Sequence, residues 1–369
     1  MSAIHRIGVM TAGGDCPGLN AVIRAVAKTA LSQHDLEVIG IEDGFLGLIQ
    51  NRMRPLTNES VSNILTLSGT ILGTNNRVSP RKYYVNVNGT LEPRDVTDRC
   101  LEHIAHNQID ALVVIGGDGT MSMASDFVRL GINCIGVPKT IDNDLYGTDV
   151  TFGFATAVSI ATEALDRVHT TAASHHRAMV VEVMGRNAGW IALHAGVASG
   201  ADVILIPEIP YDIDGICEYV ANRSRRGKRF SIICVSEGAR PKGGGQVVSR
   251  IDPTSPEPAR LGGIGQKVAA DMESATGIET RTITLGHVQR GGTPVAADRV
   301  LATEFGNKAI ELLCAGERSR LVVLRNGVIT HIPLEDAEGK QRLINLDNPL
   351  LRAARNVGTC FGDQPRIRW

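Results

Sequence analysis

The stretch Ala111-Leu-Val-Val-Ile-Gly-Gly-Asp-Gly-Thr120 decides the fold. Its aliphatic run has no polar alternation, which predicts a strand buried on both faces, as in a parallel sheet. The glycine-rich turn 116–120 is followed by a helical pattern near 121–130 and by a second apolar strand, Cys134-Ile-Gly-Val137. This order of strand, glycine turn, helix and strand is typical of a doubly wound α/β domain.

The same unit recurs along most of the chain. Upstream we expect strands at 7–11 and 36–41 around a helix at 21–28, and downstream a helix at 155–171 and strands at 178–183, 203–206, 230–235 and 280–285. The sequence therefore predicts an α/β fold of two Rossmann-like, doubly wound halves that have mostly parallel sheets and meet near residue 150. Asn-Gly pairs at 88–89 and 326–327 predict hairpins, and the Gly-, Pro- and Ser-rich stretch 240–263 is expected to be a loop.

Composition limits the possible function classes. The chain has 369 residues, of which 43% are hydrophobic and 21% charged, with a net charge of −1. These values favour two globular domains and argue against disorder and against broad electrostatic binding of nucleic acid or an anionic membrane. Seven scattered cysteines without a C-x-x-C pair, and the absence of a signal-like apolar start, predict reduced thiols and a cytoplasmic location.

Two glycine-rich loops follow expected strands and open expected helices. They are Thr11-Ala-Gly-Gly-Asp-Cys-Pro-Gly18 and Gly116-Gly-Asp-Gly-Thr120. Glycines let the backbone approach a phosphate, and a helix N-terminus favours its charge, so the loops predict a nucleotide phosphate with Mg²⁺ at Asp118. The first loop alone is equally compatible with a tight structural turn. The second loop is neither a Walker nor a G-x-G-x-x-G motif, which argues against a Rossmann dehydrogenase.

Carboxylates follow the strand after the second glycine loop, in Pro138-Lys-Thr-Ile-Asp-Asn-Asp144. In an extended backbone, a spacing of two residues places Asp142 and Asp144 on the same side. One carboxylate could then accept the proton of a substrate hydroxyl while the other organises a metal. The alternative is an Asx turn that joins the two halves, although Lys139 would be unusual in a bare turn.

Basic residues gather near strand ends in the second half. Arg177 begins one expected strand and Arg186 follows its end, and Arg281, His287 and Arg290 lie around the strand at 282–285. Guanidinium groups suit a phosphate monoester. Scattered basic residues more often form a solvated surface, but these lie beside glycines at strand ends, which favours contact with a ligand.

Together the motifs closely resemble the phosphofructokinase family. Nearly the whole chain carries them in the family order: T-x-G-G-D-x-P-G-x-N, G-G-D-G-T, P-K-T-I-D-N-D, V-V-E-V-M-G-R, S-E-G and L-G-H-V-Q-R-G-G. The resemblance implies a glycolytic kinase that transfers a phosphoryl group to the 1-hydroxyl of fructose 6-phosphate and yields fructose 1,6-bisphosphate. It also implies an active site between the halves, with ATP as donor and Mg²⁺ as cofactor.

The resemblance also implies individual roles. The expected catalytic residues are Asp142 as general base, Thr140, Lys139 and Arg186. The expected donor-binding residues are Gly14, Arg77, Val78, Gly117, Asp118, Gly119 and Thr120, with Mg²⁺ at Asp118 and Asp144. The expected acceptor-binding residues are Thr140, Ile141, Asp142, Arg177, Met184, Gly185, Arg186, Glu237, Arg281, His287, Val288, Gln289 and Arg290.

The identity of the donor depends on two positions. In pyrophosphate-dependent relatives, an aspartate replaces the last glycine of G-G-D-G and obstructs the nucleotide, whereas Gly119 leaves that room. Lys139, in contrast, is typical of pyrophosphate users, so the chain resembles the mixed-substrate group of the family. Asn76 stands where short bacterial enzymes have a phosphate-bridging arginine, and Lys139 could supply that charge. We expect ATP, with pyrophosphate as the alternative.

The resemblance also concerns assembly and domain limits. Family members supply the residues at the positions of Arg177 and Arg281 across a subunit interface, which implies a homodimer or homotetramer. We expect residues 1–152 with about 290–318 to bind the donor, and 153–289 with about 319–369 to bind fructose 6-phosphate, with the hairpin at 321–332 packed on the second half.

Two rival functions remain open at this point. NAD and lipid kinases share G-G-D-G-T but lack I-D-N-D and L-G-H-x-Q-R-G-G, both of which this chain has. A non-catalytic sugar-phosphate or nucleotide sensor predicts the loss of Asp142 or Asp118, and both residues are present.

Overall fold

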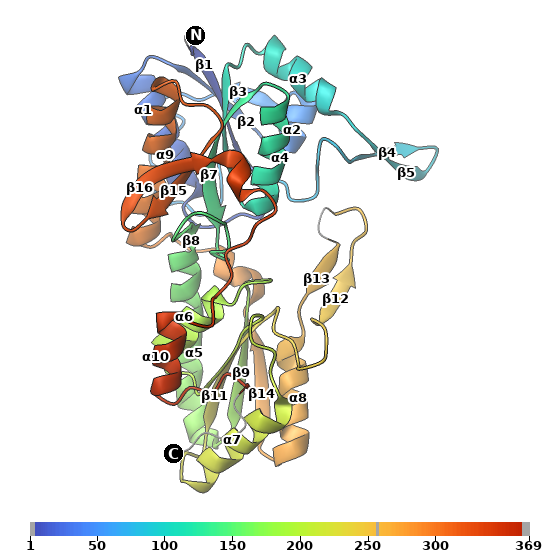
Figure 1. The fold of residues 1–369 in the computed structure, drawn as a ribbon, viewed down its shortest axis with the longest axis vertical. Helices are drawn as coiled ribbons and strands as arrows, with labels where there is room; N and C mark the ends of the chain where they lie inside the picture. Colours follow the sequence, from blue (N-terminus) through green and yellow to red (C-terminus); the bar gives the residue numbers. More distant parts are fainter. Residues whose placement is uncertain (1–3, 256–257, 364–369) are drawn as a thin grey trace.

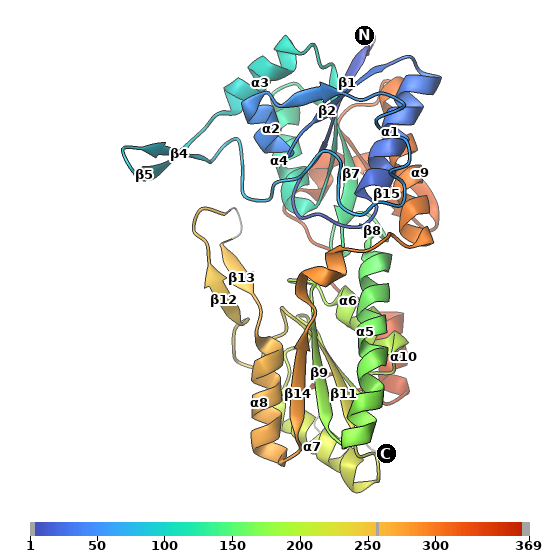
Figure 2. The same ribbon diagram turned by 180° about the vertical axis from the view of Figure 1, so that it is seen from behind.

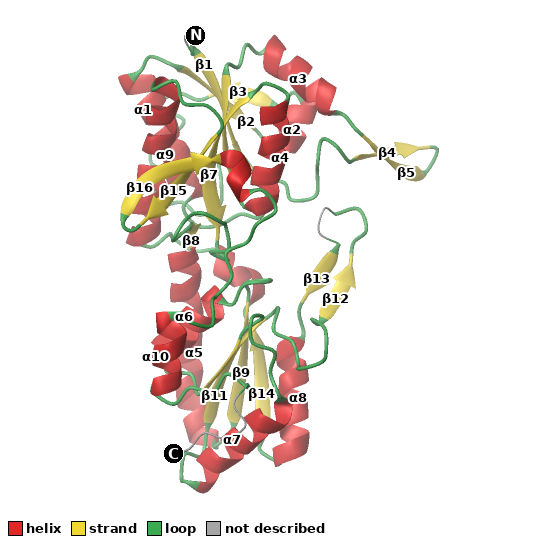
Figure 3. Cartoon of the chain, in the orientation of Figure 1, coloured by secondary structure: helices red, strands yellow, loops and turns green. Residues whose placement is uncertain are grey.

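The computed structural model describes residues 4–255 and 258–363. The chain forms two halves that lie one above the other along the long axis of the molecule (Figure 1). Each half has a mostly parallel sheet with helices on both faces, as the cartoon coloured by secondary structure shows (Figure 3). This confirms the predicted α/β fold with two doubly wound halves.

The first half contains the larger sheet, which has eight strands among the described residues. Its main path runs in the order β16 (Val328–Pro333), β15 (Arg320–Arg325), β7 (Asn133–Thr140), β6 (Ala111–Gly116), β1 (Arg6–Thr11), β2 (Glu37–Ile41) and β3 (Met53–Pro55). The strand β8 (Phe152–Gly153) pairs with the end of β7. All six residues of β6 are buried, as its continuous apolar sequence predicts.

Helices cover both faces of this sheet. One face packs against α1 (Leu19–Gln33) and α9 (Ala296–Cys314), and the other against α2 (Phe45–Gln50), α3 (Thr97–His106) and α4 (Asp118–Arg129). Since α9 packs directly on α1, the chain returns to the first half after it has built most of the second. The molecule is therefore interwoven rather than a simple tandem of two domains.

The second half has a four-stranded, all-parallel sheet. Its order is β10 (Val203–Leu205), β11 (Ser231–Ser236), β9 (Ala178–Val183) and β14 (Thr280–Thr284). The helices α5 (Phe154–His175) and α6 (Trp190–Ala198) cover one face, and α7 (Ile213–Arg225) and α8 (Ile264–Thr276) cover the other. Viewed from behind, the carboxyl ends of these strands point toward the first half (Figure 2).

Two small hairpins extend from the body of the protein. The first, β4 (Tyr83–Val87) and β5 (Thr90–Arg94), forms at the predicted Asn-Gly turn. The second, β12 (Val248–Ile251) and β13 (Ala259–Leu261), lies inside the stretch that the sequence predicts as a loop. That prediction is wrong for these strands, because β12 and β13 pair with each other despite the flanking glycines and prolines.

The hairpin of β15 and β16 contradicts the prediction that residues 321–332 pack on the second half. Instead β15 extends the first sheet by parallel pairing with β7, with Leu321 opposite Gly136. A Cβ atom at Gly136 would lie 3.0 Å from Leu321 Cδ1, so the missing side chain lets the leucine pack closely. The helix α10 (Pro349–Asn356) does lie against α6 of the second half. The other domain limits stay predictions.

The described residues contain no helix that is long and apolar enough to cross a membrane. All seven cysteines are free thiols, and all but Cys314 are buried.

Candidate active site

The strand ends of both halves surround one cleft with a volume of about 740 Å³. From the first half it is lined by Gly13, Gly14, Asp15, Asn75, Asn76, Arg77, Val78, Ser79, Gly117, Asp118, Gly119, Thr120, Met123, Lys139, Thr140, Asp142 and Asp144. The rest of its lining is Met184, Arg186, Glu237, Ser249, Arg250, Ala259, Arg260, Leu261, His287, Arg290 and Gln341. Parallel strands bring their carboxyl ends to one edge, which explains why motifs far apart in sequence meet here.

The second glycine loop presents a helix N-terminus to the cleft. The helix α4 begins at Asp118, with Gly117 in extended backbone as its N-cap. The Asp118 carboxylate accepts a hydrogen bond of 2.7 Å from the Gly119 N–H. A Cβ atom at Gly119 would meet nothing within 4 Å, so a side chain there would project into open space. The loop thus offers backbone amides and free volume to an anionic ligand.

The first glycine loop lies close to basic side chains of other elements. The Arg290 guanidinium donates a hydrogen bond of 2.7 Å to the Asp15 carbonyl oxygen, and the Lys139 ammonium donates to the Gly14 carbonyl oxygen. A Cβ atom at Gly14 would lie 2.8 Å from the Arg290 guanidinium, so a side chain at this position would require the guanidinium to move. This contact links the first loop of the first half to the last motif of the second half.

The loop after β7 carries two carboxylates into the cleft, but not by the extended geometry that the sequence analysis assumes. Asn143, between Asp142 and Asp144, has a φ of 54°, which is left-handed backbone. Its amide oxygen accepts a hydrogen bond of 3.0 Å from the Thr151 N–H, and the Thr140 hydroxyl accepts one of 3.0 Å from the Asp142 N–H. These side-chain contacts favour a turn over a straight strand. Both carboxylates nevertheless line the cleft.

Burial and crowded charge control the protonation of these carboxylates. Burial raises the pKa of Asp142, against the opposing charges of Arg290, Arg186 and Lys139. Its Oδ1 atom is buried and has no hydrogen-bond partner in the described structure. Burial, together with the negative charges of Asp142 and Asp118, raises the pKa of Asp144 to about 8. Asp142 and Asp144 are therefore buried carboxylates whose charged forms are disfavoured by the loss of solvation and, for Asp144, by neighbouring negative charge.

Asp118 and Asp144 are bridged by a residue from the C-terminal segment. The Gln341 amide nitrogen donates to Asp118 Oδ2 at 3.2 Å and to Asp144 Oδ2 at 3.4 Å. Within 4–255 and 258–363, no group of three or more His, Cys, Asp or Glu residues could enclose a metal alone. Mg²⁺ usually takes one or two carboxylates and completes its shell with water and substrate phosphates. Asp118 and Asp144 therefore fit Mg²⁺ that is shared with a bound phosphate chain.

Lys139 lies at the centre of the site and is only 3% exposed. Burial lowers the pKa of its ammonium, while the nearby thiol Cys16 and the carboxylates Asp15 and Asp142 act in the opposite direction. The site thus contains a desolvated cation next to the predicted base, Asp142.

The second half contributes a carboxylate and basic groups to the facing wall. The Glu237 carboxylate accepts a hydrogen bond of 3.1 Å from the Arg186 N–H. Burial, followed by the charge of Asp142, raises the pKa of Glu237 to about 7. Arg186 lies in left-handed backbone, at φ 49°, in the loop after β9. Met184 and His287 complete this wall.

Some predicted residues do not line the cleft. Ile141 is fully buried beneath the loop, Val288 is 62% exposed, and Gly185 is in left-handed backbone at φ 136°. Gln289 is buried and its amide oxygen accepts from the Met184 N–H at 2.9 Å, so it supports the loop instead of facing a ligand.

Arg177 and Arg281 also lie away from the cleft of their own chain. Both guanidinium groups pair with Glu279, at 3.3 Å and 2.5 Å respectively. They belong to the amino-terminal ends of β9 and β14, whereas the cleft lies at the carboxyl ends. Within one chain, these arginines therefore do not contribute to the site.

Several lining residues of the cleft were not predicted from the sequence. Gln341 lies 197 residues from Asp144, and no local pattern marks it. Ser249, Arg250, Ala259, Arg260 and Leu261 come from the hairpin that was expected to be a loop. For Asp15, Asn75 and Ser79 a signal existed, because each adjoins a residue that the sequence analysis selected.

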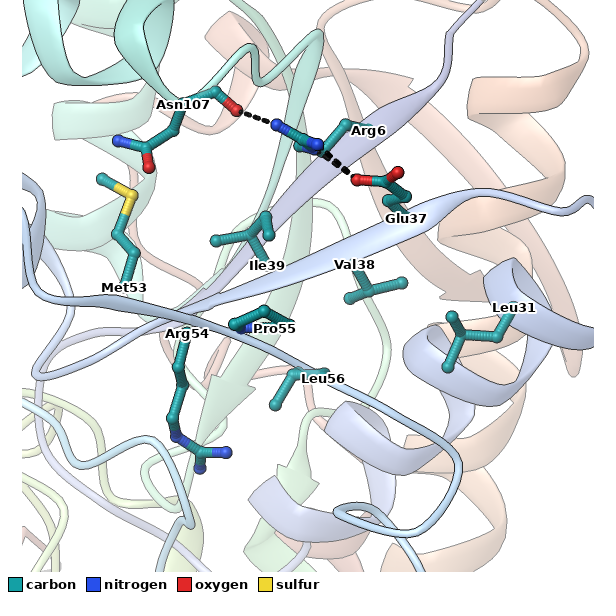
Figure 4. Close-up of a pocket in the computed structure, with 10 residues that line it drawn as sticks. All are labelled: Arg6, Leu31, Glu37, Val38, Ile39, Met53, Arg54, Pro55, Leu56 and Asn107. Atoms are coloured by element: carbon teal, nitrogen blue, oxygen red, sulfur yellow. Dashed lines mark hydrogen bonds and ion pairs between the residues drawn. The ribbon is translucent and has the colours of Figure 1, made fainter.

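A second, smaller pocket lies at the edge of the first sheet, between β2, β3 and α1 (Figure 4). Arg6 lines it, pairs with Glu37 at 2.5 Å and donates a hydrogen bond of 2.8 Å to the Asn107 carbonyl oxygen. None of the predicted site residues lines this pocket, so the large cleft is the candidate active site.

Comparison with known proteins agrees with this geometry. The family model described as "Phosphofructokinase" matches residues 6–313. A protein of Clostridium perfringens named ATP-dependent 6-phosphofructokinase 2 is 51% identical over 365 residues, which cover 98% of this chain and 100% of that protein. An ATP-dependent 6-phosphofructokinase of Spirochaeta thermophila is 46% identical over 361 residues, with 98% of each chain covered.

Solved structures show the same fold. The T-state phosphofructokinase of Pichia pastoris matches with a TM-score of 0.77 and 31% identity, over 91% of this chain and 36% of that chain. The pyrophosphate-dependent phosphofructokinase of Nitrosospira multiformis matches with a TM-score of 0.80 over 98% of this chain and 94% of that chain. Because its sequence is only 20% identical, this match shows a shared fold and nothing about the donor. With its matching family model, near-full-length relatives and strand-end cleft, this chain belongs to the phosphofructokinase family.

Proposed function

We propose that this chain is an ATP-dependent 6-phosphofructokinase, which transfers a phosphoryl group from ATP to the 1-hydroxyl of fructose 6-phosphate. The observation that carries this proposal is the full-length relationship to ATP-dependent 6-phosphofructokinases at up to 51% identity in the relatives above. The cleft supports it, because one wall offers glycine loops and a helix N-terminus and the other offers basic groups for a sugar phosphate.

Asp142 is suited to act as the general base. Its buried Oδ1 atom has no hydrogen-bond partner in the described structure, so it is available to the 1-hydroxyl. Burial raises its pKa toward a range that suits proton transfer, while Arg290, Arg186 and Lys139 oppose that rise. As the sugar oxygen attacks the terminal phosphorus, its proton passes to Asp142, the new O–P bond forms, and the bond to the bridging oxygen breaks to release ADP.

The surrounding cations stabilise the charge that develops during this transfer. Lys139 and Arg186 line the cleft together with Asp142, and the positive charges of both act on its carboxylate. His287 and Arg290 are placed for the 6-phosphate, and Glu237 for a sugar hydroxyl. Cations fixed in a partly dry cleft stabilise such charge more strongly than water does.

Asp118 and Asp144 would hold Mg²⁺ together with the donor phosphates. The raised pKa of Asp144 and the clustered carboxylates favour a bound cation. When bound, Mg²⁺ supplies neutralisation of the β- and γ-phosphate charge. Gln341 keeps the two carboxylates together.

The choice of donor rests on Gly119. Open space at its Cβ position leaves room for the nucleotide side of the phosphate chain. Lys139 keeps pyrophosphate as the second candidate donor. The decisive experiment measures formation of fructose 1,6-bisphosphate by the purified protein with ATP and with pyrophosphate, with Asp142→Asn as the inactive control. Turnover with pyrophosphate but not ATP would overturn the donor assignment, and no turnover with either would overturn the function.

We also propose that the site is completed in a homo-oligomer. Arg177 and Arg281 are held together by Glu279 and lie far from their own cleft, so they are available to the 6-phosphate site of a second copy. The test mixes the inactive variants Arg281→Ala and Asp142→Asn after subunit exchange. Activity should reappear, because some mixed sites receive both intact residues, whereas mixtures without activity would contradict shared sites. A cytoplasmic location remains our expectation.

A further inference from the structure

The β12–β13 hairpin is a part of the cleft that the proposed mechanism does not use. It leaves the second half next to α8 and reaches toward the first half, on the side where the β4–β5 hairpin extends (Figures 1 and 2). Ser249, Arg250, Ala259, Arg260 and Leu261 from its two strands line the same cleft as the glycine loops. The hairpin therefore adds two arginines to the wall of a phosphate-binding site.

The two arginines stand opposite each other across the strand pair. The register pairs Arg250 with Arg260 directly. Like charges in directly opposed positions of an antiparallel pair repel each other and destabilise it. Only Arg260 has a described polar side-chain contact, a hydrogen bond of 3.1 Å to the Ser255 hydroxyl, which carries no charge. An anion between the arginines would remove this repulsion.

The hairpin and the residues that flank it are bonded to the acceptor wall. The Arg186 guanidinium donates to the Ala259 carbonyl oxygen at 3.4 Å, and Gln246 donates to the Gly238 carbonyl oxygen at 3.2 Å. The Gly263 N–H donates to the Glu182 carboxylate at 3.2 Å. These bonds hold the hairpin against β9 and the loops that follow β9 and β11, so its arginines line the same cleft as the donor loops from a fixed position.

Asp252 shows that the hairpin approaches the nucleotide side of the cleft. Its pKa is lowered by hydrogen bonds from Thr254 and, to a smaller extent, by the positive charges of Arg77 and Arg250. Arg77 belongs to the first half and Arg250 to the hairpin, so both halves contribute cations to this mouth of the cleft. The 6-phosphate side has its own cations, His287 and Arg290, on the acceptor wall.

We propose that Arg250 and Arg260 bind the phosphate chain of the donor nucleotide and extend the donor site onto the second half. This rests on the proposed function. The chemistry suits the ligand, because each guanidinium can donate two parallel hydrogen bonds to phosphate oxygens, and a triphosphate carries enough charge to bridge two opposed arginines. The donor is therefore held by both halves, which links its binding to their relative position.

The experiment measures binding of a non-hydrolysable ATP analogue with Mg²⁺ to the full chain by calorimetry, together with steady-state kinetics. Each of Arg250→Ala and Arg260→Ala should weaken analogue binding about tenfold, since a charged hydrogen bond at a partly exposed site is lost. The KM for ATP should rise by a similar factor, while the KM for fructose 6-phosphate stays within about twofold. Arg250→Lys should recover part of the affinity, because it keeps the charge but not the forked geometry.

The matched control is Arg94→Ala, which removes an exposed arginine from the other hairpin, outside the cleft. It should leave both KM values unchanged. The proposal is overturned if folded Arg250→Ala and Arg260→Ala proteins bind the analogue like the wild type, or if only the KM for fructose 6-phosphate rises. A wild-type protein that neither binds the analogue nor turns over ATP would instead refute the function on which the proposal rests.

Discussion

Replacing Gly119 by aspartate tests the donor assignment most sharply. Gly119 is the second residue of α4, and its Cβ position faces open space in the cleft. The Cβ atom of the new side chain would therefore enter the donor site without meeting any described atom within 4 Å. An acidic residue in the first turn of a helix is stabilising by about 0.3–1 kcal/mol, so folding should not suffer.

The expected loss of ATP binding follows from Coulomb repulsion. A carboxylate about 5 Å from a phosphate charge costs about 3 kcal/mol at an effective dielectric constant of about 20, and salt reduces this to about 2 kcal/mol. Asp118, Asp142 and Asp144 line the same cleft, so the new carboxylate would join an existing cluster of negative charge. A cost of 2–3 kcal/mol corresponds to a rise of about 30- to 150-fold in the KM for ATP.

The assay compares KM values for ATP, pyrophosphate and fructose 6-phosphate in the wild type, Gly119→Asp and Gly119→Ala, with thermal unfolding as the folding control. Gly119→Ala should bind ATP nearly normally, because its methyl group enters open space. The KM for fructose 6-phosphate should change little in both variants. A folded Gly119→Asp protein whose KM for ATP stays within about twofold of the wild type would refute the placement of the nucleotide beside α4.

Other changes test the remaining parts of the site. Asp142→Asn should lower kcat by about 10²- to 10⁴-fold with little change in the KM for fructose 6-phosphate, since a base is lost and a similar shape is kept; comparable turnover would exclude Asp142 as the base. Lys139→Ala should lower kcat with either donor, and full turnover in steady-state assays would count against a role for this cation in phosphoryl transfer. Gln341→Ala removes the amide that bridges the Asp118 and Asp144 carboxylates, so this variant should be less stable than the wild type by about 1–2 kcal/mol without metal, and Mg²⁺ should restore part of that stability. Denaturant unfolding with and without Mg²⁺ measures both effects, and an equal loss of stability in the two conditions would contradict the bridging role. Burial raises the pKa of Glu237 to about 7 in the folded state, so the folded protein binds this proton more tightly than the unfolded chain and loses stability as the pH rises from about 5 to about 8. The free energy of unfolding of Glu237→Gln should fall less steeply across this pH range, and the same dependence on pH in the variant and the wild type would contradict the raised pKa.

The sequence predicts the arrangement of both sheets well for a simple reason. Continuous aliphatic runs such as those at 111–115 and 178–183 need burial on both faces, and this need is local to the run. The glycine loops and carboxylate motifs directly follow such strands, so their convergence follows from parallel packing. Asp118, Asp142 and Arg186 could therefore be assigned to one cleft before the fold was described.

The errors concern contacts that no local pattern encodes. The pairing of β15 with β7 depends on the space beside Gly136, which is visible only after the sheet has formed. The turn at Asp142 depends on the Asn143 amide, which bonds to a residue eight positions away. A spacing rule for extended chains cannot anticipate such a side-chain contact.

The sequence alone determined the doubly wound class, the order of the strands along the chain and the residue types that approach phosphate, because each depends on short runs. Only the tertiary structure decided which distant residues share the cleft. Gln341 bonds to Asp118 and Asp144, which lie 223 and 197 positions away in the sequence. Arg250 lies opposite Arg260 in a strand pair that the loop-like composition of this stretch does not predict. These positions depend on packing between segments that are far apart in the chain. The contacts that stabilise them form only in the folded protein, so no short stretch of sequence predicts them.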